Sequence, residues 1–212
     1  MQEINQHKTL WYIADPMCSW CWGFAPTIEA IRQRYAERLT IAIILGGLRP
    51  GTTQPIANRQ REEILGHWHN VQRMTGQPFQ FEGAMPEGFI YDTEPACRGV
   101  LTASSLAPSL TFPFFSAIQQ AFYVKQIDVT KPENIIQIAA NLGIDDKQFL
   151  QVFSSETMKK KTLANFGKTK RWGIGGFPSL ILQNNENYHL LSNGYSPAET
   201  LYPQIDKLLK SA

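Results

Sequence analysis

Two cysteines three positions apart restrict the fold of this chain more than any other feature. The segment Cys18-Ser19-Trp20-Cys21 follows a short apolar run, Leu10 to Ala14, which is typical of a buried strand. Behind it we expect a helix that begins near Cys18 and bends at Pro26. Thr40 to Leu45 is apolar almost throughout, which predicts a second strand that is buried on both faces. The first 48 residues therefore predict strand, helix, strand, with the two strands parallel.

The position of the two thiols gives them different chemistry. A helix N-terminus carries unsatisfied N–H groups and about half a positive elementary charge, so it stabilises an anion. A thiolate is therefore favoured at Cys18, while Cys21 lies one turn further along the same face, where we expect it to be more buried. This asymmetry predicts that Cys18 is the nucleophile in disulfide exchange and that Cys21 resolves the mixed disulfide.

Two other interpretations of the cysteine pair are open, namely half of a zinc site or two unrelated core cysteines. A structural zinc ion needs four ligands, and the other candidates are Cys97 and four histidines. None of them forms a second pair at ligand spacing, and His67 and His69 face different sides of a predicted helix. The strand before the pair and the helix after it favour redox use, so we expect no metal. We expect Cys97 to pack in the core.

Composition limits the classes of function. Of the 212 residues, 43% are hydrophobic and 18% are charged, so the chain can bury a core and is not disordered as a whole. The formal net charge of +2 is too small to indicate nucleic acid as the main partner. No apolar run reaches the roughly 18 residues of a membrane-spanning helix, and the first residues lack the pattern of a secretory signal. We therefore expect a cytoplasmic protein with neither nucleic acid nor membrane as a partner.

The rest of the chain divides into two parts. Residues 51–152 show successive helical patterns and no convincing strand, which predicts a helical insertion. After a basic helix, a glycine-rich segment leads to Pro178, and two short strands at 179–182 and 188–191 flank a turn. These strands predict an antiparallel pair, followed by a last helix that ends near Lys210.

This order of elements resembles the DsbA-like branch of the thioredoxin superfamily over the whole chain. The resemblance rests on the cysteine pair, the kinked helix, the helical insertion and Gly175-Gly176-Phe177-Pro178-Ser179 before the strand pair. Residues 17–24 and 46–51 are most similar to the FrnE-like subgroup of predicted disulfide isomerases. The resemblance implies an α/β, thioredoxin-like fold, in which 1–50 and 153–212 form the thioredoxin-like domain and 51–152 form a helical insertion domain.

The resemblance also implies a substrate groove. In this superfamily the corresponding Phe177-Pro178 bond is cis and faces the nucleophilic cysteine, so that the backbone of Phe177 can pair with an extended peptide. Trp20 would offer an aromatic surface to an apolar side chain of the substrate. Thr93 and Arg98 are candidates for contact with a carboxylate of a peptide or of glutathione, because glutathione-using relatives form their pocket at this stretch.

Three functions follow from these observations. The first is a thiol–disulfide oxidoreductase, a protein disulfide reductase or isomerase, which acts on protein or small-molecule disulfides, is recycled by a cellular thiol and holds no tightly bound cofactor; glutathione is a candidate co-substrate. The alternative is a glutathione-dependent transferase or isomerase of the kappa-class or 2-hydroxychromene-2-carboxylate isomerase type. Those relatives place a serine where Cys18 stands, which argues against it. The third is a chaperone-like module with incidental thiols.

Overall fold

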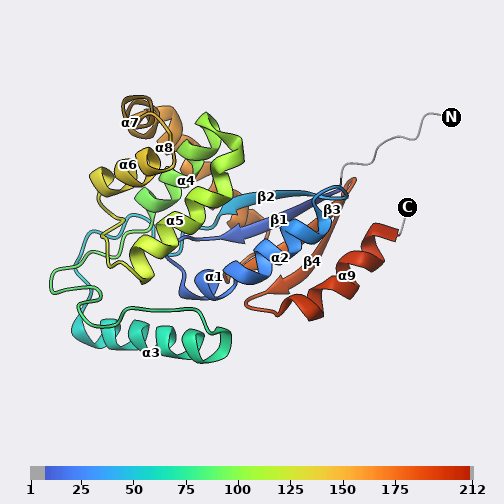
Figure 1. The fold of residues 1–212 in the computed structure, drawn as a ribbon, viewed down its shortest axis with the longest axis horizontal. Helices are drawn as coiled ribbons and strands as arrows, with labels where there is room; N and C mark the ends of the chain where they lie inside the picture. Colours follow the sequence, from blue (N-terminus) through green and yellow to red (C-terminus); the bar gives the residue numbers. More distant parts are fainter. Residues whose placement is uncertain (1–7, 211–212) are drawn as a thin grey trace.

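The computed structural model describes residues 8–210, and within them four strands form one sheet in the order β2-β1-β3-β4 (Figure 1). The strands are β1 (Thr9–Ala14), β2 (Thr40–Leu45), β3 (Ser179–Asn184) and β4 (Asn187–Asn193). Strand β1 pairs with β2 in parallel, and β3 pairs with both β1 and β4 in antiparallel fashion. The predicted parallel pair and the predicted antiparallel pair are both confirmed.

The helix that carries the cysteine pair is divided in two. Helix α1 (Ser19–Gly23) and helix α2 (Ala25–Tyr35) meet at Phe24, so the break lies two residues before the proline at which we expected a bend. Pro26 lies in the first turn of α2, where its missing N–H leaves no helical hydrogen bond unmade. The regular ladder of α2 begins with the bond from the N–H of Ile28 to the carbonyl of Phe24.

The remaining helices lie mostly between β2 and β3 in the sequence. They are α3 (Asn58–Thr75), α4 (Glu94–Leu106), the 3₁₀ helix η1 (Pro108–Leu110), α5 (Thr111–Tyr123), α6 (Pro132–Asn141), α7 (Asp146–Ser154), α8 (Glu156–Arg171) and, after β4, α9 (Ala198–Lys210). Residues 51–152, all of which the structure describes, contain no strand. Helix α8 packs on both α4 and β2, so it joins the helical part to the sheet. The division into two domains at residues 51 and 152 stays a prediction.

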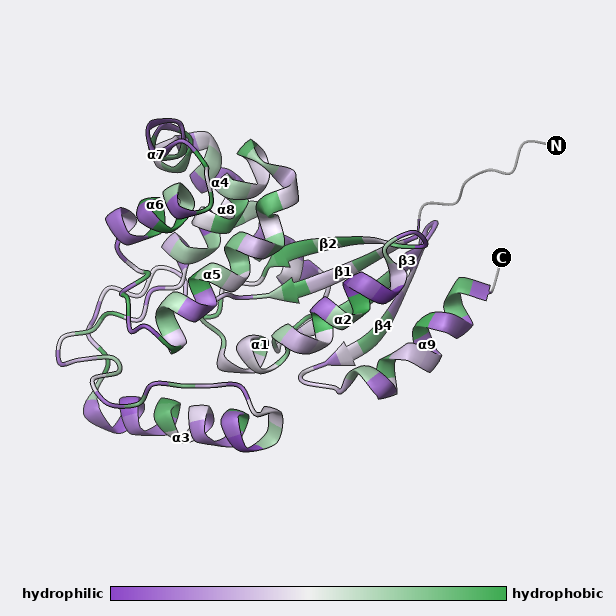
Figure 2. Cartoon of the chain, viewed as in Figure 1, coloured by the Kyte–Doolittle hydropathy of each residue, from purple (hydrophilic) through white to green (hydrophobic). Residues whose placement is uncertain are grey.

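Side chains of the central strand alternate between two apolar layers. Leu10 and Tyr12 point to the face that α2 and α9 cover, and they belong to the main core. Trp11 and Ile13 point to the other face, where they pack with Trp172 at the end of α8. This alternation is the period of two that a pleated strand imposes. Figure 2 shows the result, since β1 and β2 are among the most hydrophobic elements of the chain.

Strand β2 differs from the expectation that it is buried on both faces. It lies at the edge of the sheet, and only Ile44 and Leu45 are buried. Residues 41–43 are half-buried, and Thr40 is exposed. An unbroken apolar run does not distinguish a central strand from an edge strand that other elements cover in part. The prediction was wrong for residues 40–43 of the strand.

Helix α3 packs against α1, the helix that contains Cys21. It is largely hydrophilic (Figure 2), and its buried residues are Ile64, Trp68 and Val71. Trp68 makes ring contacts with Phe79 and Tyr123. None of the helices within residues 8–210 combines the length and the apolar character that crossing a membrane requires.

Candidate active site

The cysteine pair lies at the start of α1, shortly after the end of β1. Cys18 is the residue immediately before the first turn of α1, which confirms the predicted start of the helix. Its backbone is extended, with φ −90° and ψ 118°. Its N–H donates to the carbonyl of Asp15 at 3.0 Å, which closes a tight turn after the strand. Cys18 is 6% exposed and Cys21 is 0% exposed, so solvent reaches the first residue of the pair only. All three cysteines of the chain are free thiols.

The inner cysteine is held as a thiol by its surroundings. Burial is the main cause that raises the pKa of Cys21 well above its ordinary value, and a hydrogen bond with the side chain of Cys18 adds to it. The hydroxyl of Tyr12, on β1, lies beside the pair, and burial followed by the nearby Cys21 raises its pKa well above the usual range. Cys21 and Tyr12 are therefore both buried and protonated, whereas Cys18 keeps a small exposure to solvent.

The loop before β3 meets the exposed side of the pair. The Phe177–Pro178 bond is cis, as the family resemblance implies. The Sγ of Cys18 lies 3.6 Å from the carbonyl oxygen of Phe177, to which it donates. The carbonyl of Pro178 accepts from the N–H of Gly194 at 2.7 Å, which ties the loop to the end of β4. The structure thus brings Cys18 next to the Phe177–Pro178 bond, which lies 159 positions further along the sequence.

Aromatic side chains line the neighbourhood of the pair. Trp20 is half-buried and contacts the ring of Tyr195, with 5.9 Å between centroids. Trp22 is buried, stacks on Tyr123 and donates from Nε1 to the carbonyl of Pro78 at 2.9 Å. Trp22 therefore packs in the interior, whereas part of Trp20 stays accessible next to Cys18.

Asp15 is the residue that sequence reasoning missed, since it was interpreted only as the end of a strand. It is completely buried, and its two carboxylate oxygens accept the N–H groups of Met17 at 2.8 Å and Leu48 at 2.7 Å. The thiol of Cys97 donates to the same carboxylate at 3.4 Å. Burial raises the pKa of Asp15 from its ordinary 3.8, and these hydrogen bonds oppose the rise. An acid placed between a buried strand and a buried helix start was the signal for such a role.

Tyr91 closes the same cluster from the loop before α4. Its hydroxyl donates to the carbonyl of Met17 at 2.5 Å. Burial, then the negative charges of Asp15 and Cys18, raises the pKa of the Tyr91 phenol far above its ordinary value. The neutral hydroxyls of Tyr12 and Tyr91 thus lie near the turn from Asp15 to Cys18, which we call the redox turn.

The two predicted carboxylate-binding residues are committed to contacts within the protein. Thr93 is fully buried, and its Oγ1 accepts the N–H of Arg49 at 3.1 Å. Arg98 pairs with Glu94 at 2.8 Å, donates to the carbonyl of Phe153 and lies over the Phe153 ring. These contacts hold α4 to its neighbours. A role of Thr93 or Arg98 toward glutathione stays a prediction.

Within residues 8–210, Cys97 and the histidines do not assemble with Cys18 and Cys21 into a cation site. Cys97 is completely buried on α4, which confirms its predicted place in the core. His69 stacks on the ring of Phe81, with 3.9 Å between centroids. Among the residues that the structure describes, no three side chains of His, Cys, Asp or Glu lie close enough to hold a metal ion.

Gly46, directly after β2, leaves the space that the ring of Phe177 occupies. A Cβ at this position would lie 2.1 Å from Cζ of Phe177. We expect Gly46→Ala to push the ring out of place, to lower the free energy of unfolding by about 1–3 kcal/mol, and to lower kcat/KM for disulfide reduction by about tenfold through the displaced groove. Urea denaturation and a coupled insulin-reduction assay measure the two effects.

Gly66→Ala provides the matched control for this variant. Gly66 lies inside α3 with open space around the position of its Cβ. The same change there raises the free energy of unfolding by roughly 0.5–1 kcal/mol, because glycine destabilises a helix interior, and it leaves kcat/KM unchanged. Equal activity and equal stability of Gly46→Ala and the wild type would show that Phe177 is not held in place by this contact.

The fold and this site define a class of protein. A four-stranded sheet, a cysteine pair at the start of a helix and a cis-proline loop beside the first cysteine are the features of a thioredoxin-fold thiol–disulfide oxidoreductase. The model of the DsbA-like thioredoxin domain matches residues 10–206. The chain therefore belongs to the DsbA-like thioredoxin domain family.

The chain is similar to several known proteins. A candidate protein disulfide isomerase from Nitrosomonas europaea is 51% identical, and its structure superimposes with a TM-score of 0.92 over 97% of this chain and 98% of that one. The cytosolic disulfide reductase DsbM from Pseudomonas aeruginosa is 25% identical, with a TM-score of 0.79 over 96% of this chain and 100% of that one, and a second structure of DsbM was determined with GSH. The ClpXP adapter protein SpxH from Halalkalibacterium halodurans is 21% identical over 87% of this chain. The chain spans 61% of the length of that relative.

Proposed function

We propose that this protein reduces or isomerises disulfides of protein or small-molecule substrates, with Cys18 as the nucleophile and Cys21 as the resolving thiol. The observation that carries the proposal is the contrast within the pair. Cys18 lies at the surface end of α1, 3.6 Å from the carbonyl of Phe177, whereas Cys21 is completely buried beneath it. Cys18 is itself largely buried, and it is the one residue of the pair that keeps any exposure to solvent, so a substrate disulfide would meet it first.

The reaction needs two exchanges of sulfur partners. The thiolate of Cys18 attacks one substrate sulfur, the substrate S–S bond breaks, and the second substrate sulfur leaves as a thiolate that takes up a proton. Cys21 then loses its proton and attacks Sγ of Cys18, which releases the first substrate sulfur. The substrate gains two electrons and two protons, and the enzyme is left with a Cys18–Cys21 disulfide.

The substrate groove that we propose runs between the redox turn and the cis-proline loop. An extended substrate would pair with the backbone of Phe177, beside Pro178, while a side chain next to its disulfide rests on Trp20. The ring contact between Trp20 and Tyr195 supports this arrangement, because it gives the groove an aromatic wall on the side of β4. The buried Trp22 takes no part in substrate binding.

Two molecules of glutathione would return the enzyme to its dithiol form. The first attacks the Cys18–Cys21 disulfide and forms a mixed disulfide, and the second displaces it as oxidised glutathione, which restores both thiols. The likeness to DsbM, whose structure was also determined with GSH and whose name places it in the cytosol, supports this role and a cytoplasmic setting. We assign the chain to the FrnE-like subgroup within its family on the segments 17–24 and 46–51.

The reduction potential of the Cys18–Cys21 pair tests the proposed direction of the reaction. We expect a value between that of thioredoxin and those of glutaredoxins, about −270 to −200 mV, because a reductase must accept electrons from the cytosolic glutathione pool. Equilibration with mixtures of reduced and oxidised glutathione, followed by mass spectrometry, gives the potential. A value near −120 mV, as in a strong oxidant, would contradict reduction as the function.

A Cys97→Ser variant is the control for this measurement. Cys97 is buried on α4 and is not part of the proposed exchange. Its removal should leave the potential within about 10 mV of the wild-type value, since 30 mV already corresponds to about 1.4 kcal/mol for a two-electron couple.

A further inference from the structure

Strand β2 leaves one side of its backbone without a partner strand. In its parallel pairing with β1, the N–H of Thr40 donates to the carbonyl of Lys8 at 3.1 Å, and the N–H of Gly46 donates to that of Ala14 at 2.7 Å. Alternate residues of a strand direct their backbone groups to the same side. The even-numbered residues of β2 therefore bond to β1, and the odd-numbered residues direct their N–H and C=O groups away from the sheet.

The three odd-numbered residues differ in what they meet. The N–H of Leu45 is taken by Oδ1 of Asn165, which reaches the strand from α8 at 3.3 Å. Ile41 and Ile43 lie further along the edge, and no strand of the described chain pairs with β2 on the side that faces away from β1. Two alternate residues thus present donors and acceptors in the geometry that an additional strand needs, and Asn165 marks where such a strand would end.

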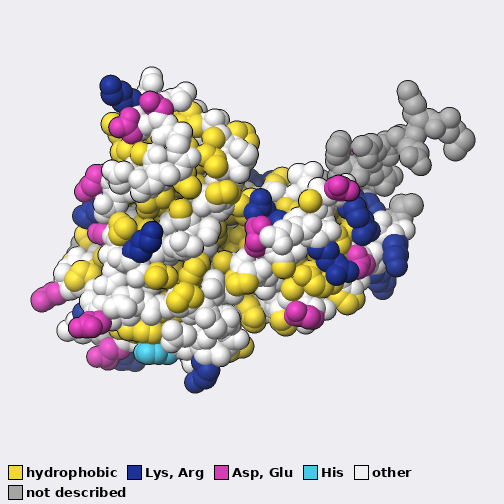
Figure 3. Space-filling model, in the orientation of Figure 1, with side chains coloured by type: hydrophobic (Ala, Val, Ile, Leu, Met, Phe, Trp, Pro, Cys, Tyr) yellow, Lys and Arg dark blue, Asp and Glu magenta, His cyan; other side chains and the backbone are white. Residues whose placement is uncertain are grey.

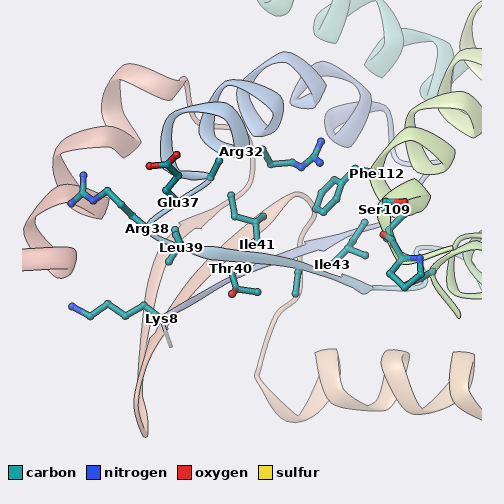
Figure 4. A pocket seen from close by; sticks show the side chains of 15 residues that line it. Lys8, Arg32, Glu37, Arg38, Leu39, Thr40, Ile41, Ile43, Ser109 and Phe112 are labelled. Carbon is teal, nitrogen blue, oxygen red and sulfur yellow. The ribbon is translucent and has the colours of Figure 1, made fainter. Parts of the chain in front are cut away.

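A cleft of about 760 Å³ runs along this edge. Its floor is formed by residues 40–43 of β2, and its upper wall by the end of α2 and the start of α5 (Figure 4). Arg32 and Phe112 approach one another across that wall, with the guanidinium 4.2 Å from the ring centroid. Four residues of an extended chain, roughly 13 Å long, would match the four residues of β2 that form the floor of the cleft.

Around the edge, basic and acidic groups balance on the cleft side, and the surplus of positive charge comes from the lysines of α8. On the cleft side the basic groups are Lys8, Arg32 and Arg38, and the acidic groups are Glu37, Glu29 and Asp206, the last two of which pair with Arg32 and Arg38. On the other side, Lys161 and Lys168 flank Asn165 on the same face of α8. Lys168 lies 4.2 Å from the ring centroid of Trp11, which is opposite Ala42 in the sheet. In Figure 3, Lys and Arg side chains, with Asp and Glu among them, lie over the end of the molecule that carries α2 and α9.

We propose that the free edge of β2 binds an extended, acidic segment of another protein as a fifth strand. The backbone of Ile41 and Ile43 would hold the segment by main-chain hydrogen bonds. Its alternating side chains would project toward Arg32 and Arg38 on one face and the lysines of α8 on the other. This surface is separate from the groove at Phe177, so a partner could dock here while the cysteine pair stays accessible.

A peptide of alternating valine and glutamate, eight residues long with blocked ends and a fluorescent label, tests the proposal. Fluorescence anisotropy measures its affinity, and NMR measures hydrogen exchange of the protein amides. We expect the affinity to exceed that of the valine–lysine counterpart at least about tenfold and to fall as salt increases. Exchange of the Ile41 and Ile43 amides should slow at least about tenfold in the complex. Equal binding of both peptides, or protection elsewhere only, would overturn the proposal.

Two further comparisons separate strand addition from other modes of binding. Ile43→Pro removes an outward-facing donor, which edge strands tolerate, whereas Ile43→Val keeps it. We expect the proline variant to lose at least about tenfold in affinity and the valine variant to bind within about twofold. A glutamate peptide that is N-methylated at alternate residues makes the same test on the unchanged protein, and its undiminished binding would overturn the proposal. So would a dimer in sedimentation that Ile43→Pro dissociates, because a second copy would then occupy the edge.

Discussion

Replacing Cys18 with serine is expected to lower kcat/KM for the reduction of insulin disulfides by at least about 10³-fold. A serine hydroxyl stays protonated at neutral pH and cannot attack a disulfide, and Cys21 is too buried to take its place. The loss should appear in turbidity and coupled-reductant assays, without a change in the far-ultraviolet circular dichroism. Full activity of Cys18→Ser would contradict the assigned nucleophile.

Cys21→Ser is expected to fail at the second exchange. The mixed disulfide between Cys18 and the substrate then has no resolving thiol, so the variant should accumulate a covalent adduct that non-reducing mass spectrometry detects. The double variant Cys18→Ser/Cys21→Ser traps nothing and controls for unspecific capture. If Cys21→Ser instead kept full turnover of glutathione with a model electrophile and formed no adduct, a glutathione-dependent transferase would be the better interpretation.

Cys97→Ser makes the same chemical change at a thiol outside the exchange. Serine can donate to Asp15 as the thiol of Cys97 does, so the buried contact at 3.4 Å keeps its character. We expect the activity of this variant to stay within about threefold of the wild type, since the side chain touches neither Cys18 nor the cis-proline loop. The contrast with Cys18→Ser therefore assigns the loss of activity to position and not to the removal of a cysteine.

Replacing Asp15 with alanine is expected to destabilise the fold by about 2–6 kcal/mol. The change leaves the buried N–H groups of Met17 and Leu48 without acceptors, and each such group costs about 1–3 kcal/mol. Urea denaturation followed by tryptophan fluorescence measures the free energy of unfolding. A loss below about 1 kcal/mol would show that water reaches these groups once the carboxylate is absent.

Asp92→Ala is the matched control for the loss of a carboxylate. Asp92 also accepts two backbone N–H groups, those of Gly51 at 2.8 Å and Glu94 at 3.0 Å. Its side chain is only half-buried, so water can replace the lost acceptor. We expect Asp92→Ala to lower the free energy of unfolding by at most about 1 kcal/mol, well below the effect at Asp15.

The pH dependence of stability provides an independent measurement on Asp15. Burial raises the pKa of this carboxyl in the folded protein above the ordinary 3.8, so between the two values the folded state binds more protons than the unfolded state. The contribution of Asp15 to stability is therefore fully present below about pH 3.8 and is lost as pH rises through the raised pKa. The free energy of unfolding of the wild type should fall with pH relative to that of Asp15→Asn, whose side chain does not titrate. A difference that is constant from pH 3.5 to 8 would contradict the raised pKa.

Much of the fold could be predicted because its signals are local. The apolar run of β1, the helical spacing after Cys18 and the turn between β3 and β4 each lie within a few residues. The sequence predicted the bend at Pro26, two residues after the break that the structure shows at Phe24. A proline is tolerated in the first turn of a new helix, so its position does not fix where that helix begins.

The candidate site was predictable in part for a similar reason. The spacing of Cys18 and Cys21 indicates a redox pair by itself, and its position after a strand predicts which sulfur is exposed. The groove residue Phe177 entered only through the family resemblance. Asp15 was missed, since its partners Leu48 and Cys97 are distant in the sequence and no local pattern links them to it.

The sequence by itself determined that a thiol pair begins a helix between two strands, because strand, turn and helix starts depend on neighbouring residues. Tertiary structure alone decided which elements meet this pair. It brought the carbonyl of Phe177 to Cys18, buried the carboxyl group of Asp15 beneath the redox turn and left the outer side of β2 without a partner strand. These outcomes depend on how the layers pack and on which strand lies at the edge of the sheet. They join residues that are distant in the sequence, and no local sequence pattern predicts such contacts.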